Sequence, residues 1–279
     1  MTDTRRHAIV TGAASGLGRA LAVRLARDGW HIALADIDAH GSEATLRVME
    51  AAGGTGEAVR LDVSCQQDWI ALHDRLRATW PRIDLLVNNA GMGCTGDVGV
   101  FPLEEWNLLL NVNLRGAIYG CHMFVDWLKE NPDGAHIINV ASFAAIAPMP
   151  SMSAYNVSKA GIVALSEALY CELQPHGVGV TVVCPMHFKT NINSAMRVYH
   201  RDRAEALRDA VQQSTTSAAD VADIAVRSME RKKLYAIPGW RARWYWWLRR
   251  LAPAGFQDGI ARDAQRLEAT ARDADRAAE

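Results

Sequence analysis

Short hydrophobic runs alternate with longer amphipathic segments along most of the chain. The runs predict strands over residues 7–11, 32–36, 58–62, 85–88, 135–141, 178–184 and 234–237. The segments between them predict helices over residues 17–29, 40–52, 66–79, 104–130, 154–174 and 218–230. Strands that alternate with helices form a parallel sheet, because each crossover carries its helix over one face of that sheet. The pattern therefore predicts an α/β fold with a doubly wound parallel sheet of about seven strands and helices on both faces.

Two segments depart from this alternation. Residues 186–217 are polar with short helical stretches, which is typical of a lid over a binding site. After residue 238 the composition shifts toward tryptophan and arginine, and then toward alanine, arginine and aspartate. We therefore expect one domain over residues 1–238, with its lid at about 186–217, and a C-terminal helical extension over residues 239–279.

The extension contains an amphipathic helix with an aromatic stripe. On a helical wheel Trp240, Trp244, Trp247 and Leu251 share one face, and the arginines of residues 240–251 lie off it. Such a helix suits a membrane interface. It suits a contact between subunits equally well, and packing against the protein's own body is a third interpretation. Residues 257–279 are expected to form an exposed helix that frays toward its end.

Composition and charge exclude several classes of function. A formal net charge of −1 gives no sign of a nucleic-acid partner, and 49% hydrophobic with 22% charged residues is ordinary for a globular protein. The five cysteines show no zinc-like spacing, so we expect no metal site, and reduced, buried thiols in a cytoplasmic protein. The first residues show no apolar stretch typical of a secretory leader, so we expect none. No apolar run reaches the roughly 18 residues that span a membrane.

A glycine-rich segment, TGAASGLG at residues 11–18, joins the first predicted strand to the first helix. Glycines at such a junction permit a tight turn and let the backbone approach a pyrophosphate, which the helix N-terminus stabilises. The segment therefore predicts a dinucleotide site in a Rossmann-type domain. The residues expected to contact the cofactor are Gly12, Ala14, Ser15, Gly16, Leu17 and Gly18.

Asp36 ends the second predicted strand and Ile37 follows it. An acid at this position can accept hydrogen bonds from the adenosine ribose hydroxyls. Its carboxylate would also repel a 2′-phosphate, and no arginine follows it to hold one. We therefore predict that the chain binds NAD in preference to NADP.

Tyr155 and Lys159 lie four positions apart in the segment SAYNVSKAG. On a helix these side chains point the same way and lie close enough to interact. A cation about 4 Å from a phenol favours the phenolate by about 4 kcal/mol at an effective dielectric constant near 20. That energy corresponds to a pKa lowered by two to three units, at about 1.36 kcal/mol each. The spacing thus predicts a tyrosine that transfers protons near neutral pH.

Four further motifs follow in order: Asp62-Val63, NNAG at 88–91, NVNLRG at 111–116 and VASFAA at 140–145. With TGAASGLG and YNVSK, they make residues 5–237 resemble the short-chain dehydrogenase/reductase family in its compact, single-domain form. The resemblance implies that Tyr155 is the general acid/base, that Lys159 lowers its pKa and holds the nicotinamide ribose, and that Ser142 polarises the substrate. It assigns a relay water to Asn113, with Asn111 as the competing candidate.

The resemblance implies further contacts with the cofactor and a reaction. The contacts are Asp62, Val63, Asn89, Ala90, Gly91, Tyr155, Lys159, Pro185, Phe188 and Thr190. The reaction is reversible oxidation of a secondary alcohol to a ketone, and the assembly is a homo-oligomer, dimeric or tetrameric. An epimerase or dehydratase on the same scaffold, or a non-catalytic nucleotide-binding or membrane-docked protein, are the alternatives.

One motif departs from the family. The run PMHFKT at residues 185–190 has Met186 where a glycine is usual, which removes backbone freedom and adds a flexible apolar side chain. Loops at the carboxyl ends of the strands should line the substrate pocket. They offer mainly apolar residues, so we expect an apolar alcohol or ketone of terpene, steroid, aryl or acyl-chain type. The candidates are Met92, Cys94, Ser142, Phe143, Ile146, Met149, Met152, Met186 and His187.

Overall fold

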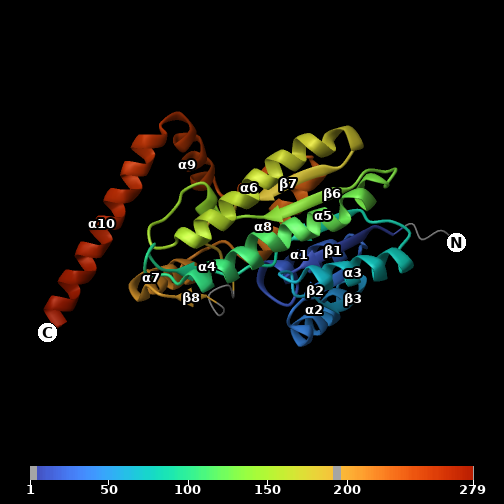
Figure 1. The fold of residues 1–279 in the computed structure, drawn as a ribbon, viewed down its shortest axis with the longest axis horizontal. Helices are drawn as coiled ribbons and strands as arrows, with labels where there is room; N and C mark the ends of the chain where they lie inside the picture. The colour runs from blue at the N-terminus through green and yellow to red at the C-terminus, as the bar shows by residue number, and fades with distance from the viewer. Residues whose placement is uncertain (1–4, 191–195, 279) are drawn as a thin grey trace.

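A parallel sheet of seven strands forms the centre of the protein (Figure 1). The computed structural model describes residues 5–190 and 196–278, and the side chains of that part up to residue 266. The order across the sheet is β3-β2-β1-β4-β6-β7-β9, and every neighbouring pair is parallel. The strands are β1 (His7–Thr11), β2 (His31–Asp36), β3 (Thr55–Arg60), β4 (Leu85–Asn88), β6 (His136–Val140), β7 (Gly179–Val183) and β9 (Tyr235–Ala236). This confirms the doubly wound α/β fold.

Helices cover both faces of the sheet, because side chains alternate along each strand. In β1, Ala8 and Val10 belong to one buried cluster and Ile9 to another. The first cluster packs under α1 (Gly16–Ala26), α2 (Ala39–Ala51) and α8 (Ala218–Glu230). The second packs under α3 (Gln66–Thr79), α5 (Gly116–Lys129) and α6 (Ser153–Leu173). Both layers hold the strand ends, and therefore the loops that follow them, in fixed positions.

Several predicted boundaries are wrong. β3 begins three residues before the predicted start and ends at Arg60, because this edge strand is half exposed and its hydrophobic pattern is weak. The helix predicted over 104–130 is divided into α4 (Leu103–Leu110), a π-helical turn (Asn111–Arg115) and α5. The predicted lid contains α7 (Arg201–Gln212) and a short strand, β8 (Arg197–Val198), which pairs with β5 (Cys94–Thr95). Residues 191–195 of the lid lie outside the described residues.

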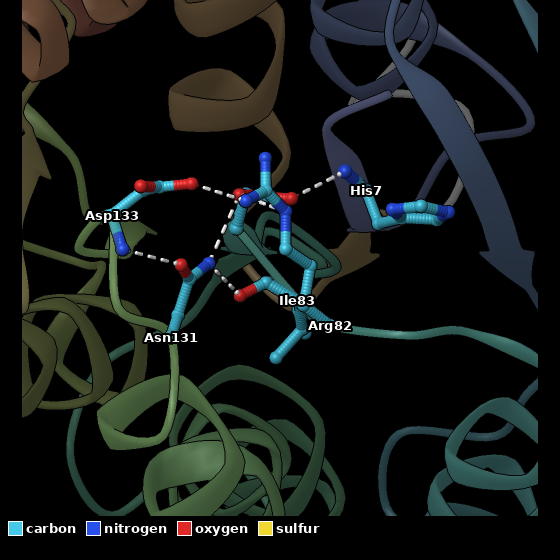
Figure 2. A network of polar contacts seen from close by, with 6 residues as sticks. His7, Arg82, Ile83, Asn131 and Asp133 are labelled. Carbon is cyan, nitrogen blue, oxygen red and sulfur yellow. Dashed lines mark hydrogen bonds and ion pairs between the residues drawn. The ribbon is translucent and has the colours of Figure 1, made fainter. Parts of the chain in front are cut away.

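A polar network joins the amino ends of three strands (Figure 2). The glycine loop lies at the opposite, carboxyl ends of the strands. Asp84, just before β4, accepts a hydrogen bond from the backbone nitrogen of His7 at 2.7 Å and one from Nδ2 of Asn131 at 2.9 Å. Arg82 forms ion pairs with Asp84 and with Asp133. The network holds the starts of β1, β4 and β6 together.

The C-terminal extension consists of α9 (Trp240–Leu251) and α10 (Pro253–Ala278), which Figure 1 shows at the end of the molecule away from the N-terminus. One face of α9 packs on the body, where Ala242 is fully buried and Trp246 is half-buried. The predicted stripe points the other way, so packing on the protein's own body is the wrong interpretation for it. Within the part of the chain that the structure describes, no helix is both long and apolar enough to cross a membrane.

The cysteines differ from the expectation that all five are buried. Cys94, Cys121 and Cys184 are buried, whereas Cys65 is half-buried and Cys171 is exposed. All five are free thiols. The exposed position of Cys171 follows from its place near the end of α6, on the outer side of that helix.

Candidate active site

A cavity of about 700 Å³ opens at the carboxyl ends of the central strands. It runs from Asp36 after β2, past the glycine loop after β1, to Tyr155 on α6. It continues to residues of α7, α9 and α10. Most of the predicted site residues therefore share one cavity: Gly12, Ser15, Gly16, Leu17, Asp36, Ile37, Asp62, Val63, Asn89, Ala90, Gly91, Met92, Ser142, Phe143, Met149, Met152, Tyr155, Lys159, Pro185, Met186, His187, Phe188 and Thr190.

The glycine loop has the shape of an anion site. Gly12 and Gly16 have φ angles of +66° and +53°, which an L side chain rarely adopts. A Cβ on Gly18 would lie 2.0 Å from the carbonyl oxygen of Gly12, so only glycine allows this turn to close. The N-terminus of α1 borders the cavity, and its first turn carries no acid. Its free backbone N–H groups therefore suit a phosphate. Ala14 and Gly18 shape the loop without lining the cavity.

Asp36 marks one end of the cavity. Its Oδ2 accepts a hydrogen bond from the backbone nitrogen of Ala14 at 2.9 Å, and its Oδ1 accepts one from Asp38 at 3.0 Å. These bonds fix the carboxylate beside the glycine loop and leave it further acceptor capacity. Ile37, Asp62 and other residues of the loops after β2 and β3 line the same end. This end of the cavity therefore combines the apolar side chains of Ile37, Leu61 and Val63 with the carboxylates of Asp36 and Asp62.

Asn89, Ala90 and Gly91 form the cavity floor after β4. The Asn89 side chain donates to the carbonyl oxygen of Thr11 at 2.8 Å, which ties this loop to the glycine loop. A Cβ on Gly91 would come within 3.1 Å of Oδ1 of Asn113 and 3.3 Å of Nζ of Lys159. The absence of a side chain at Gly91 therefore keeps the space in front of Lys159 open.

Tyr155 lies in the first turn of α6, with Ser142 opposite it at the end of β6. Burial raises the pKa of Tyr155, while a hydrogen bond with Ser142 lowers it in part. This contradicts the expectation of a pKa lowered by Lys159. Nζ of Lys159 lies 5.9 Å from the centre of the phenol ring and donates to the carbonyl oxygen of Val140 at 2.9 Å. The phenol and the ammonium lie near each other, but burial sets the direction of the pKa shift, and the group that lowers the pKa in part is Ser142.

Lys159 itself is almost completely buried at the base of the cavity. Burial lowers its pKa from 10.5 to about 8. The bond to Val140 uses one of its three ammonium protons. The remaining donors can serve a hydroxyl group of a ligand in the cavity.

Asn113 lies behind the cavity wall, in the π-helical turn between α4 and α5. Its Oδ1 accepts from the backbone nitrogen of Met92 at 2.8 Å, and its Nδ2 donates to the Met92 carbonyl oxygen at 2.9 Å. Such turns often occur at functional sites, because they reorient one backbone segment inside a helix. Asn111, the competing candidate, accepts a bond from the exposed side chain of Arg115. The geometry favours Asn113, which is next to Gly91 and Lys159.

The apolar end of the cavity includes residues that the sequence did not suggest. Cys94 and Ile146 were expected here but face buried clusters instead: the pairing of β5 with β8 turns Cys94 inward, and Ile146 packs against α9. Seven of the unexpected lining residues come from the lid and the extension, and no local motif marks them. They are Met196, Leu207, Val211, Tyr245, Phe256, Ile260 and Asp263.

The extension is tied to the loop that carries Ser142. Nη1 of Arg249 donates to the carbonyl oxygens of Ala145, at 2.8 Å, and of Ile146. The ring of Tyr245 lies 6.0 Å from the ring of Phe143 and 6.0 Å from that of Phe256. These contacts make α9 and the start of α10 the far wall of the cavity.

The cavity residues fit a dinucleotide. A side chain on Gly18 would fill the turn, the N-terminus of α1 can hold a pyrophosphate, and Asp36 can accept from a ribose. Lys159 lies at the other end with donors for a second ribose.

The comparisons with known proteins agree with this geometry. Residues 6–200 match the family model for short chain dehydrogenases. The match covers more than half of the 279 residues, and the chain therefore belongs to the short-chain dehydrogenase family of oxidoreductases.

The relatives differ in length and in how specific their names are. A probable oxidoreductase, EphD of Mycobacterium tuberculosis, is 42% identical over 183 residues, which are 66% of this chain and 31% of that protein. The chain thus spans about a third of the length of that relative. A 3β-hydroxysteroid dehydrogenase 1 from Eggerthella lenta is 34% identical over 187 residues, which are 67% of this chain and 72% of the relative.

Solved structures of similar proteins hold nicotinamide dinucleotides. A short chain dehydrogenase/reductase from Burkholderia phymatum in complex with NAD has a TM-score of 0.79 and 31% identity, covering 84% of this chain and 88% of that one. A short-chain dehydrogenase from Sphingobium yanoikuyae in complex with NADPH has a TM-score of 0.74 and 28% identity, covering 92% and 96%. A nicotinamide dinucleotide is therefore the cofactor class, and the comparisons do not choose between its two forms.

Proposed function

We propose that the protein interconverts a secondary alcohol and a ketone on a bulky apolar substrate, with NAD as its cofactor. The observation that carries this proposal is the meeting of three groups in one cavity: the hydroxyls of Ser142 and Tyr155 and the ammonium of Lys159. The walls beyond them are mostly methionine and aromatic side chains. A polar proton-transfer centre at the base of an apolar cavity suits an oxygen atom on a hydrophobic body.

The hydroxyls of Ser142 and Tyr155 can divide the proton transfer between them. Oγ of Ser142 accepts a hydrogen bond from the backbone nitrogen of Ala144 at 3.1 Å, which fixes its position and leaves its own proton to donate. Ser142 can therefore hold the substrate oxygen while Tyr155 gives a proton to it or removes one. When bound, a nicotinamide ring supplies the hydride acceptor or donor, and its positive form favours the phenolate of Tyr155.

Asp36 supports the preference for NAD. Its carboxylate is held beside the glycine loop by two backbone N–H groups, where a 2′-phosphate would meet a fixed negative charge. Initial rates with NAD⁺ and NADP⁺ on the same alcohol test this. We expect kcat/KM to favour NAD⁺ by at least about tenfold, which is about 1.4 kcal/mol. A preference for NADP⁺ would refute the role of Asp36.

The size and lining of the cavity support a bulky substrate. Of its volume of about 700 Å³, the part from Asp36 to Lys159 suits the dinucleotide, and the cavity continues beyond that part to residues of α7, α9 and α10. Tyr245, Phe256 and Ile260 extend the apolar wall well beyond Tyr155. The hydroxysteroid dehydrogenase among the relatives acts on molecules of this kind, as its name states. Polycyclic and aryl secondary alcohols are therefore the first candidates for a screen.

Tyr155→Phe tests the mechanism. We expect kcat to fall by about 10²- to 10⁴-fold, because the variant lacks the proton-transfer hydroxyl, while binding of NADH is retained. Tyr170→Phe is the matched control, since it removes a hydroxyl from the same helix outside the cavity. Unchanged turnover in Tyr155→Phe would contradict the proposal.

The same screen separates a dehydrogenase from an epimerase or dehydratase on this scaffold. A dehydrogenase accumulates one NADH for each ketone formed, whereas the alternatives release product without net reduction of NAD⁺.

A homo-oligomeric assembly and a cytoplasmic location stay predictions. Light scattering on a size-exclusion column would measure the first.

A further inference from the structure

Helix α9 has two faces with different environments. The inner face carries buried Ala242 and half-buried Tyr245 and Trp246. The outer face carries Trp240, Trp244, Trp247 and Leu251, whose exposed fractions are 72%, 61%, 54% and 80%. We call these four residues the outer stripe.

The outer stripe is exceptional among the aromatic residues of this chain. Four of the nine tryptophans, Trp30, Trp69, Trp80 and Trp127, are buried, and Trp106 and Trp246 are half-buried. The three exposed tryptophans all belong to the outer stripe. Water contact with three indole rings on adjacent turns is unfavourable, and such patches usually mark an interaction surface.

The charged side chains of the segment that carries the stripe have one sign. Residues 231–257 contain seven lysines and arginines and no aspartate or glutamate. Arg249 is engaged with the body by hydrogen bonds to carbonyl oxygens. Arg250 lies over the ring of Trp246 in α9 at 3.9 Å and over the ring of Tyr235 in β9 at 5.6 Å. Arg241 and Arg243 are exposed, and on a helix they fall on opposite sides of the stripe.

A second copy of this face is a poor partner. A symmetric contact between two outer stripes would bring arginines of one copy toward arginines of the other, with no carboxylate in residues 231–257 to compensate. Stable interfaces also engage about 20–30 residues on each side, far more than the four of the stripe. An anionic lipid surface meets neither objection. Its headgroup region favours indole rings, and its phosphates pair with arginine.

We propose that α9 docks the protein on anionic lipid surfaces, with the outer stripe in the headgroup region and Arg241 and Arg243 on lipid phosphates. The inner face of α9 carries Tyr245, which lines the cavity. Docking therefore brings the cavity wall within about one helix diameter, 10–12 Å, of the lipid. The binding itself is independent of the reaction.

Co-sedimentation with sucrose-loaded vesicles tests the proposal. We expect the full chain to bind vesicles of phosphatidylcholine and phosphatidylglycerol, to bind them less as salt rises, and to bind pure phosphatidylcholine weakly. R241Q/R243Q should weaken binding to the anionic vesicles by about 30-fold. W244S/W247S should abolish it, because the apolar contact is lost.

Two matched controls guard against unspecific effects. R27Q/R47Q removes two exposed arginines, one at the end of α1 and one in α2. V98S/V100S removes two exposed apolar side chains from a loop. Both should bind as the wild type does, and thermal melting confirms that all variants fold. Failure of the wild type to bind anionic vesicles would overturn the proposal. So would equal loss in R27Q/R47Q, or a dimer in sedimentation equilibrium that W244S/W247S converts to a monomer.

Discussion

Replacing Gly18 by alanine is expected to disrupt dinucleotide binding while the rest of the fold persists. A Cβ at this position would lie 2.0 Å from the carbonyl oxygen of Gly12, 2.6 Å from its carbonyl carbon and 2.7 Å from Nδ2 of Asn89. Carbon atoms in contact are about 3.5 Å apart. The turn must therefore open by about 1 Å, and two of the three obstacles are backbone atoms that no rotamer change can move.

The opening separates the loop from the helix N-terminus that faces the cavity. A hydrogen bond to a charged group contributes about 1.5–3 kcal/mol, so loss of one such bond to a pyrophosphate weakens binding by about 10- to 100-fold. The overpacked turn should also lower the free energy of unfolding by about 1–3 kcal/mol. The loss of binding free energy is therefore expected to be about as large as the loss in the free energy of unfolding.

Titration calorimetry with NADH measures the dissociation constant, and urea denaturation measures the free energy of unfolding. Gly259→Ala is the matched control, because a Cβ there meets nothing within 4 Å and alanine favours the α10 helix. It should leave NADH binding unchanged. If Gly18→Ala folds and binds NADH within about twofold of the wild type, the placement of the pyrophosphate at this loop is wrong.

Three further outcomes follow from other parts of the structure. Asp84→Asn replaces an acceptor by a donor that faces either the His7 N–H or the Asn131 amide, so we expect the free energy of unfolding in urea to fall by about 2–4 kcal/mol. Asp133→Asn, at a side chain that is 70% exposed, should lower it by less than about 1 kcal/mol. Equal losses in the two variants would contradict this account of the network. Phe256→Ala should raise KM about tenfold for a polycyclic alcohol but not for a small one, because about 50 Å² of apolar contact is lost at about 25 cal/mol per Å². Trp247→Ala, on the outer face of the extension, should leave both KM values unchanged. Burial, with the charge of Lys232, lowers the pKa of His136 from 6.5 to about 3, so the unfolded chain binds a proton between these pH values that the folded chain does not. The free energy of unfolding should fall as pH drops through this window, by at most about 1.4 kcal/mol per pH unit, and His136→Gln should show a flatter dependence in urea midpoints.

The fold and the chemistry-bearing loops were predictable because their signals are local. Strands of the buried sheet, such as β1 and β6, are buried throughout and have a hydrophobic centre, and the glycine loop follows β1 directly. Tyr155 and Lys159 share a helix face by spacing alone. The edge strand β3 was misplaced because half-exposed residues carry little hydrophobic pattern. The break in the helix around Asn113 was missed, because its side chain is bonded to Met92, 21 positions away.

The burial of individual side chains and the contacts between distant positions were decided by the tertiary structure and could not be predicted from the sequence. The sequence predicted a stripe on α9, but its exposure depends on which face of the helix meets the body. The cavity wall joins Phe143 to Tyr245, about a hundred positions along the chain, and no pattern of nearby residues encodes that distance. The pKa of Tyr155 is a similar case: the spacing to Lys159 indicated a lower value, but desolvation depends on every segment packed around the ring and raises it. The local sequence pattern determined which elements form and which groups they carry. The environment of those groups was decided only by the tertiary structure, because it depends on contacts between distant positions of the chain.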